Sequence, residues 1–184
     1  SIFSGKAEAE IQIDTDKCIF ILNKNLIESK KFNKSTKVVN LVTSVNENNY
    51  EVLEKVDNKE DISLLNAEIV VSAGRGLKGP ENWEMIENLA KKLNAATACS
   101  KPVSDAGWRP HHEHVGQTGI KISPQIYFAI GISGAIQHLA GVNSSKNIIV
   151  INSDPEAPFF KSADYGIVGD AFEVVPELLK ALDN

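Results

Sequence analysis

The stretch richest in residues that could bind a ligand is VGQTGIKISPQIYFAIGISGAIQH, residues 115–138. It places glycine, threonine, glutamine and histidine around one apolar run. Small residues at Gly134 and Ala135 would let backbone N–H groups approach an anion. A pyrophosphate at the start of a helix near Ser133 is therefore the natural ligand. The alternative is structural, because the glycines also allow close strand-helix packing and His138 could be a core histidine with satisfied hydrogen bonds. This stretch alone leaves both interpretations open.

A second group of potential ligands is HHEH, residues 111–114. Its three imidazoles and one carboxylate are groups that bind zinc. Consecutive residues rarely converge on one ion without distant ligands, and Cys18 and Cys99 are not placed to help. We therefore expect a solvated loop here and no metal site.

The elements that position these residues follow residue 66, where the composition shifts. Apolar runs bounded by glycine alternate with helical stretches from there on, which predicts βαβ units and a parallel sheet covered on both faces. The predicted fold is α/β, a Rossmann-like doubly wound parallel sheet. The expected strands are EIVVSA (68–73), AATACS (95–100), QIYFAIGI (125–132), KNIIVIN (146–152) and DYGIVGD (164–170).

Three helices are expected between and after these strands. Apolar residues at helical spacing in GPENWEMIENLAKKLNA (79–95) predict the first, a short one begins near Ser133, and AFEVVPELLKAL (171–182) forms the last. Pro176 could kink this last helix or mark its first turn. In such sheets ligands bind beyond the carboxyl ends of the strands, where the glycine-bearing turns lie.

Residues 1–66 have a different pattern, with short β-like runs between polar connections. This pattern predicts a small strand-rich, largely antiparallel N-terminal segment before the sheet. The expected strands are residues 10–13, 18–22, 37–45 and 49–56.

Composition excludes several classes of protein. Of the 184 residues 42% are apolar and 23% are charged, and no run approaches the ~20 apolar residues that a membrane span requires. The net charge of −5 comes from interspersed acids and bases, without the basic stripe typical of nucleic-acid binding. Two cysteines without a regular framework and no signal-peptide pattern favour the cytoplasm or an organellar matrix.

From about Ala67 to the C-terminus, the order of the motifs resembles the FAD-binding domain of the electron transfer flavoprotein α subunit, in the family that includes the FixB proteins. The resemblance is carried by VSAGRGLKG, DAGW, VGQTG, ISPQIYFAIGISGAIQHLAG, INSDPEAPFF and ADYGIVGDAFEVVPEL. It implies that residues 67–184 are the FAD-binding domain and residues 1–66 the tail of a first domain with its connection. We therefore expect the chain to be a fragment, and its start at SIF without methionine agrees with that.

The resemblance also implies FAD-binding roles. In the family, the position of His138 lies beside flavin O2, that of Thr118 near N5, and that of Arg75 near the pyrophosphate. Alternatively, Arg75 is a surface arginine after a strand, and Asp170 serves to cap the last helix, a use that need not exclude a role near the adenosine. The implied cofactor-binding residues are Arg75, Ser100, Lys101, Val115, Gly116, Gln117, Thr118, Ser133, Gly134, Ala135, Ile136, Gln137, His138, Asn152, Asp170 and Ala171.

Two of these residues bear on redox chemistry. A donor at His138 would stabilise the reduced flavin, which is anionic along N1–C2=O2. Lys101 stands where the family usually has arginine, and its compact charge cannot lie flat over the ring as a guanidinium does. This departure predicts that Lys101 stabilises the reduced flavin less than an arginine would.

Three functions follow as hypotheses. The first is an electron carrier, a heterodimer with a β subunit, in which FAD takes electrons from flavin dehydrogenases such as acyl-CoA dehydrogenases and passes them to a quinone-linked oxidoreductase or another acceptor. The sequence contains no Ser/His/Asp order, HExxH motif or Walker lysine loop, which are the motifs that would indicate an enzyme that makes or breaks bonds. The second is an NAD- or adenine-nucleotide-binding domain of a related fold, and the third is a flavin-free interaction module.

Overall fold

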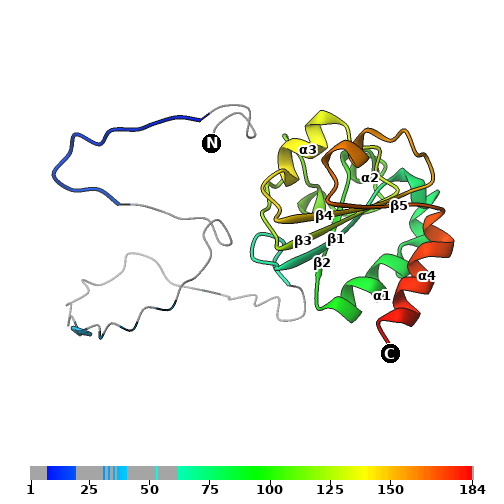
Figure 1. Ribbon diagram of the computed structural model, residues 1–184, viewed down its shortest axis with the longest axis horizontal. Coiled ribbons are helices and arrows are strands. Elements are labelled where there is room, and N and C mark those ends of the chain that lie inside the picture. The colour runs from blue at the N-terminus through cyan, green and yellow to red at the C-terminus, as the bar shows by residue number, and fades with distance from the viewer. Residues whose placement is uncertain are drawn as a thin grey trace.

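The computed structural model describes residues 8–19, 31, 33, 35, 37–40, 53 and 62–183. Residues 62–183 form a parallel sheet between two layers of helices (Figure 1). The strands run in the order β2-β1-β3-β4-β5, and every neighbouring pair is parallel. Their bounds are β1 Ile69–Ala73, β2 Ala96–Cys99, β3 Ile126–Ile130, β4 Asn147–Asn152 and β5 Tyr165–Val168. The predicted α/β class and parallel sheet are confirmed.

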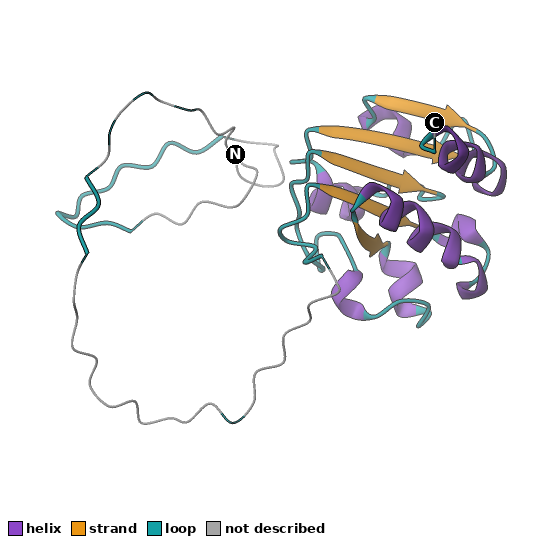
Figure 2. Cartoon of the chain, turned by 90° about the horizontal axis from the view of Figure 1, so that it is seen from below, coloured by secondary structure: helices purple, strands orange, loops and turns teal. Residues whose placement is uncertain are grey.

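The helices cover both faces of the sheet. Two of them, α1 (Glu84–Leu93) and α4 (Ala171–Ala181), contact each other and lie on one face, while α3 (Ile136–Val142) lies on the other (Figures 1 and 2). A short helix, α2 (Lys101–Asp105), follows β2 directly. Turns of 3-10 helix complete the domain at Arg75–Leu77, Pro80–Asn82, His111–Glu113 and Pro158–Ser162.

Each face of the sheet has its own core, because alternate residues of a strand point to opposite faces. In β1, Val71 packs in the core shared with α1 and α4, and Val70 packs in the core shared with α3. The central strands β1 and β3 are buried almost throughout, which is why their sequences are continuous apolar runs. All four residues of the edge strand β5 are exposed, so the predicted covering of the sheet is incomplete at that edge.

Local signals set the ends of two helices. Asn94 adopts a left-handed conformation with φ 51° and ends α1, as a C-cap residue commonly does. The Asp170 carboxylate accepts the Phe172 N–H at 3.0 Å and caps α4. Because α4 begins at Ala171, Pro176 lies inside the helix, so the first-turn interpretation of this proline is wrong.

Two further expectations need correction. The helix expected near Ser133 begins only at Ile136, because Gly134 takes φ +85° and the Ser133 carbonyl accepts the Phe159 N–H at 3.1 Å. Residues 10–13 and 37–40 form no strand, and Ile11 is 80% exposed. An apolar alternation becomes a strand only where a neighbouring strand takes up its backbone hydrogen bonds. The other strands expected before residue 66 lie wholly or largely outside the described residues.

Within the described ranges, no helix is long and apolar enough to cross a membrane.

Candidate functional site

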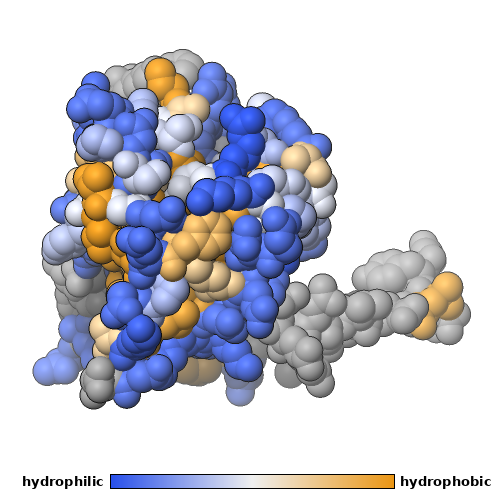
Figure 3. Space-filling view, turned by 90° about the vertical axis from the view of Figure 1, so that its right-hand side faces the viewer, coloured by the Kyte–Doolittle hydropathy of each residue, from blue (hydrophilic) through white to orange (hydrophobic). Residues whose placement is uncertain are grey.

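A cavity of about 480 Å³ opens at the carboxyl ends of β1 to β4. The order of the strands reverses between β1 and β3, and ligands of open α/β sheets bind beside such a switch point. This end of the sheet faces the viewer in Figure 3, where hydrophobic side chains lie among hydrophilic ones. Eleven of the residues implied by the resemblance line the cavity: Arg75, Ser100, Lys101, Val115, Gln117, Thr118, Ser133, Ala135, Gln137, His138 and Asn152.

Five implied residues do not line this cavity. Asp170 and Ala171 lie at the start of α4, where Asp170 caps the helix and lies 3.6 Å from Lys78 Nζ. Gly116, Gly134 and Ile136 belong to segments that border the cavity without forming its wall.

The floor of the cavity depends on two glycines that bring separate turns into contact. A Cβ atom on Gly76, after β1, would lie 2.6 Å from the Cα atom of Gly131, after β3. Gly131 also has φ +61°, a conformation that side-chain-bearing residues rarely adopt. The close approach leaves backbone rather than side chain at the centre of the switch point.

His138 is the most buried titratable group that the resemblance had placed in the cavity, at 6% exposure. Its Nε2 atom lies 2.7 Å from the Tyr127 hydroxyl, and its Nδ1 atom is buried without a hydrogen bond of good geometry, although the backbone of Val115 lies close enough to raise the pKa of the ring. Burial, and after it the positive charge of His114, lower the pKa of His138 to about 4, while the backbone of Val115 acts in the opposite direction. The ring is therefore neutral at pH 7, with Tyr127 oriented against one nitrogen.

Lys101 lies at the mouth of the cavity and forms an ion pair with Asp105. Its Nζ atom donates to both carboxylate oxygens of Asp105 at 2.8 Å, one helical turn away. The hydrogen bond from Lys101 lowers the pKa of Asp105. Both side chains are 53% exposed, so the pair is open to solvent and can separate at little cost.

The VGQTG segment spans the cavity wall from β2 to α3. The Val115 N–H donates to the Cys99 carbonyl at 3.1 Å, and the Gln117 N–H donates to the Gln137 carbonyl at 2.7 Å. These two bonds hold the segment between the elements on either side. The side chains of Gln117 and Thr118 stay exposed and can reach a ligand.

Asn152 orders the opposite wall. Its side-chain amide donates to the Ile132 carbonyl at 3.0 Å, and its side-chain oxygen accepts the Asp154 N–H at 3.0 Å. The turns after β3 and β4 are thereby tied together at the edge of the cavity. Arg75 is exposed at the first of the glycine turns, and its guanidinium forms no hydrogen bond or ion pair with the described residues.

Several cavity residues were missed by the sequence reasoning, above all His114, with Gly74, Gly76, Asp105 and Asp154. The prediction of a solvated loop is wrong for Glu113 and His114, which are 8% and 2% exposed. The four side chains of HHEH do not converge: Glu113 binds Arg109, and His111 Nδ1 lies 3.4 Å from Ser104. The signal for His114 was its place directly before the VGQTG segment.

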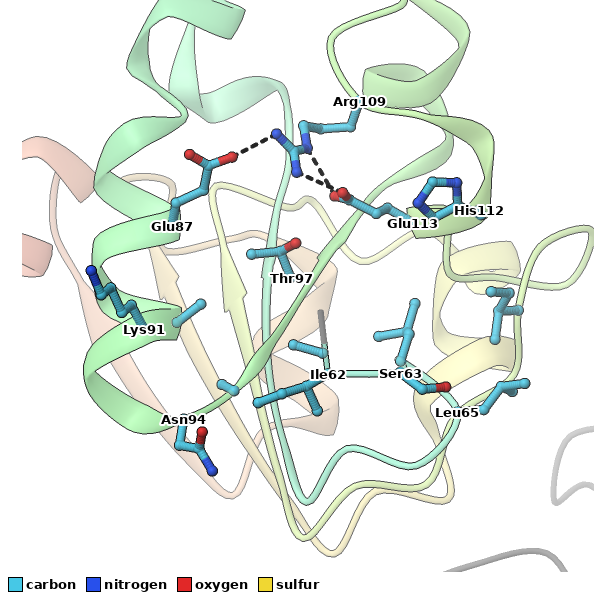
Figure 4. A pocket seen from close by; sticks show the side chains of 15 residues that line it. Ile62, Ser63, Leu65, Glu87, Lys91, Asn94, Thr97, Arg109, His112 and Glu113 are labelled. Atoms are coloured by element: carbon cyan, nitrogen blue, oxygen red, sulfur yellow. Dashed lines mark hydrogen bonds and ion pairs between the residues drawn. The ribbon is translucent and has the colours of Figure 1, made fainter. Parts of the chain in front are cut away.

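A second hollow, the β2 groove, lies beside the edge strand β2 and has a volume of about 750 Å³ (Figure 4). Arg109 crosses its upper end and binds both oxygens of Glu113 at 2.6 and 2.9 Å and Glu87 at 2.7 Å. The guanidinium also lies 5.4 Å from the ring of Trp83. The guanidinium of Arg109 is therefore already paired with two carboxylates of this groove.

Residues 63–143 match the family described as "Electron transfer flavoprotein FAD-binding domain". The electron transfer flavoprotein subunit alpha of Mycobacterium leprae is 39% identical over 183 residues, 97% of this chain and 57% of that protein. The mitochondrial subunit of Oryza sativa subsp. indica is 52% identical over 130 residues, 71% of this chain and 36% of that protein. The subunit of Paracoccus denitrificans is 52% identical over 127 residues, 69% of this chain and 41% of that protein.

The chain thus spans between about a third and just over half of the length of these relatives. The match includes the glycine turns, α2, the VGQTG segment and α3, which together form most of the cavity wall. This chain belongs to the electron transfer flavoprotein α subunit family, and the part that the family profile matches is the FAD-binding domain.

Proposed function

We propose that this chain binds FAD noncovalently in the cavity at the carboxyl ends of β1 to β4 and serves as the FAD-binding part of an electron carrier. The observation that carries the proposal is the cavity itself. It lies at the switch point of the sheet, and it is lined by His114, whose buried Nδ1 atom forms no hydrogen bond with a described residue. A buried polar atom without a hydrogen bond is costly, and a ligand that accepts one removes this cost.

The residues present fit FAD. Arg75, at a glycine turn, offers five N–H donors with no described partner, which suits a phosphate. The glycine floor at Gly76 and Gly131 lets backbone approach a ligand closely. Gln117, Thr118 and His138 supply hydrogen-bonding groups to a polar ring edge. A volume of about 480 Å³ lies within the usual range of cofactor sites.

The roles of the remaining residues follow from their positions. Ser100 and Lys101 lie at the start of α2, where they would contact the ring, and Asn152 would hold the wall on the side of the adenosine. Ser133, Ala135 and Gln137 would contact the middle of the ligand. Asp170 and Ala171, at the start of α4, would support the adenosine side of the cavity without lining it.

FAD supplies one- and two-electron redox chemistry when it is bound. The chain would receive electrons from flavin dehydrogenases such as acyl-CoA dehydrogenases and pass them to a quinone-linked oxidoreductase or another acceptor. A β subunit would be its partner in a heterodimer. The names of its relatives, mitochondrial in rice and bacterial in Paracoccus, support a place in a mitochondrial matrix or a bacterial cytoplasm.

A carrier needs a tuned cofactor rather than an acid and a base that act on a substrate bond. His138 suits this purpose, because burial keeps its ring neutral at pH 7 while Tyr127 fixes one nitrogen. We propose residues 67–184 as the FAD-binding domain and residues 1–66 as the tail of a preceding domain with its connection.

The proposal is tested by adding FAD to the purified chain, removing free ligand by desalting and recording the visible absorption spectrum. We expect retention close to one FAD per chain, and no retention of NAD or AMP under the same conditions. Arg75→Gln should weaken retention, whereas Lys91→Gln, which removes one cation from the β2 groove, should not. Retention of NAD or AMP instead of FAD, or no difference between the two variants, would contradict the proposal.

A further inference from the structure

His114 is a buried imidazole in the cavity wall. It follows the 3-10 turn His111–Glu113 and precedes Val115, whose N–H donates to the Cys99 carbonyl of β2 at 3.1 Å. The His114 carbonyl accepts the Ile120 N–H at 2.9 Å, which closes the VGQTG segment into a loop. With 2% exposure and a place among the cavity-lining residues, the ring faces the cavity rather than bulk solvent.

Two glycines hold the His114 ring. A Cβ atom on Gly116 would lie 3.2 Å from Nε2, and one on Gly119 would lie 2.7 Å from Nδ1. The ring therefore fits because Gly119 lacks a side chain, and a side chain at Gly116 would crowd it. Its Nδ1 atom is buried and forms no hydrogen bond with any described residue. A fixed imidazole with an unused nitrogen is a site at which a proton can be added or lost without rearrangement of the loop.

The turn that carries His114 is anchored from outside the cavity. Glu113 binds the Arg109 guanidinium through both carboxylate oxygens, and Arg109 reaches Glu87 on α1 (Figure 4). Because Glu113 and Arg109 saturate each other, neither is available to pair with a charge on His114. The β2 groove thus holds this histidine in place without neutralising it.

Titratable groups face His114 from several elements. The pKa of His114 is lowered by burial first, then by the positive charges of His111 and Lys101, while Asp105 raises it. The His111 ring lies 5.5 Å from the His114 ring, centroid to centroid. The charged or titratable groups around it are His111 and Glu113 of its own turn, Lys101 and Asp105 of α2, His138 of α3 and Cys99 of β2.

We propose that His114 is a proton-binding residue of the cofactor cavity, which takes up one proton from solvent when reduction adds negative charge to the cavity. The inference rests on the proposed binding of FAD. The electron comes from an external donor, a flavin dehydrogenase in the cell or dithionite in the test. The proton forms an N–H bond at the free ring nitrogen, so one negative and one positive charge enter the cavity together.

The physical reason is the neighbourhood of the ring. A new negative charge in the cavity opposes the effects of burial and of Lys101, and it therefore raises the affinity of His114 for a proton. Coupling of this kind appears as a dependence of the midpoint potential on pH. Where uptake of one proton accompanies one electron, the reduction equilibrium changes tenfold per pH unit, which equals about 59 mV.

The first test is an NMR titration of the imidazole of His114 in the FAD-loaded chain, oxidised and then reduced with dithionite. Assignment by backbone connectivity avoids dependence on any variant that fails to fold. We expect the proton affinity of His114 to rise at least tenfold on reduction, while that of the exposed His112 changes less than twofold. An equal proton affinity of His114 in both redox states would overturn the inference.

The second test is the midpoint potential across pH for the unaltered chain, His114→Gln and His112→Gln. We expect His114→Gln to remove the uptake of one proton from the pH dependence of the one-electron potential, and the matched control His112→Gln to keep it. FAD binding with the same slope in all three proteins would overturn the inference alone. Failure of the chain to bind FAD would overturn the proposed function and this inference together.

Discussion

The two hollows of this domain differ in whether their polar groups already have hydrogen-bond partners. The β2 groove is the larger, at about 750 Å³ against about 480 Å³, but its central cation Arg109 is already bound by Glu87 and Glu113. The cavity at the strand ends keeps a buried nitrogen of His114 that forms no hydrogen bond with a described residue. The proposed FAD site is therefore the smaller hollow, chosen for its free hydrogen-bonding groups and not for its volume.

The difference also separates stability from binding. A charge pair that is already formed and largely buried supports the fold, and loss of one member leaves the other desolvated without compensation. A buried polar group without a partner costs stability until a ligand forms its hydrogen bond. Variants in the groove should therefore change the free energy of unfolding, and variants in the cavity should change the affinity for FAD.

The largest effect is expected for Arg109→Met, which would strip Glu113 of its partner. The Glu113 side chain is 11% exposed, so the free energy of unfolding should fall by about 3 kcal/mol. Urea unfolding measures this loss. The folded fraction should bind FAD within tenfold of the normal affinity, and a large loss of affinity with unchanged stability would reverse the comparison.

The next effect concerns pH. His138 has a pKa of about 4 in the folded chain against 6.5 when unfolded, so only the unfolded state gains a proton as the pH falls through 6.5 toward 4. The free energy of unfolding should therefore fall with acidification across that window, by about 2 kcal/mol at pH 5 relative to pH 7. Urea unfolding of the FAD-free chain and of His138→Gln at both pH values measures the contribution of His138 to this loss. An equal loss in the variant would show that other groups cause it.

Arg75→Gln should act on binding alone. The guanidinium is exposed and unpaired among the described residues, so its loss should leave urea unfolding unchanged. One charge-assisted hydrogen bond to a phosphate is worth about 1.5 kcal/mol at its lower bound, which corresponds to roughly tenfold in affinity for FAD. Titration calorimetry against Lys91→Gln provides the matched comparison. A tenfold loss for the groove variant would count against the assignment of the two hollows.

The smallest effect is expected for Lys101→Arg, which restores the guanidinium usual in the family. A planar fork can keep its bond to Asp105 and also stack on a ring, so FAD affinity should rise about threefold and the one-electron potential should shift upward. Fluorescence titration and spectroelectrochemistry check the two quantities. A lower affinity and potential in Lys101→Arg would show that the lysine is better suited to this chain.

Much of the sheet could be predicted from the sequence because its strands are buried on both faces. Val70 and Val71 point to opposite cores, so the run that contains them is apolar throughout. The position of the cavity followed from the same pattern, since parallel strands place their terminal turns at one end. Eleven predicted site residues line that cavity.

The failures of prediction have physical causes that lie outside local sequence. The start of α3 was wrong because Gly134 turns left-handed and Ser133 bonds to Phe159, twenty-six residues away. The burial of Glu113 and His114 depends on Arg109 and on Glu87 of another helix. The expected strand at residues 10–13 failed because an alternating pattern does not supply a strand to pair with.

The central claim, that the smaller cavity and not the larger groove binds the cofactor, is tested most directly by a crystal structure of the chain with FAD. We predict electron density for FAD at the carboxyl ends of β1 to β4, in contact with Arg75, Gln117 and His138. Density for FAD in the β2 groove, beside Lys91 and Thr97, would contradict the account.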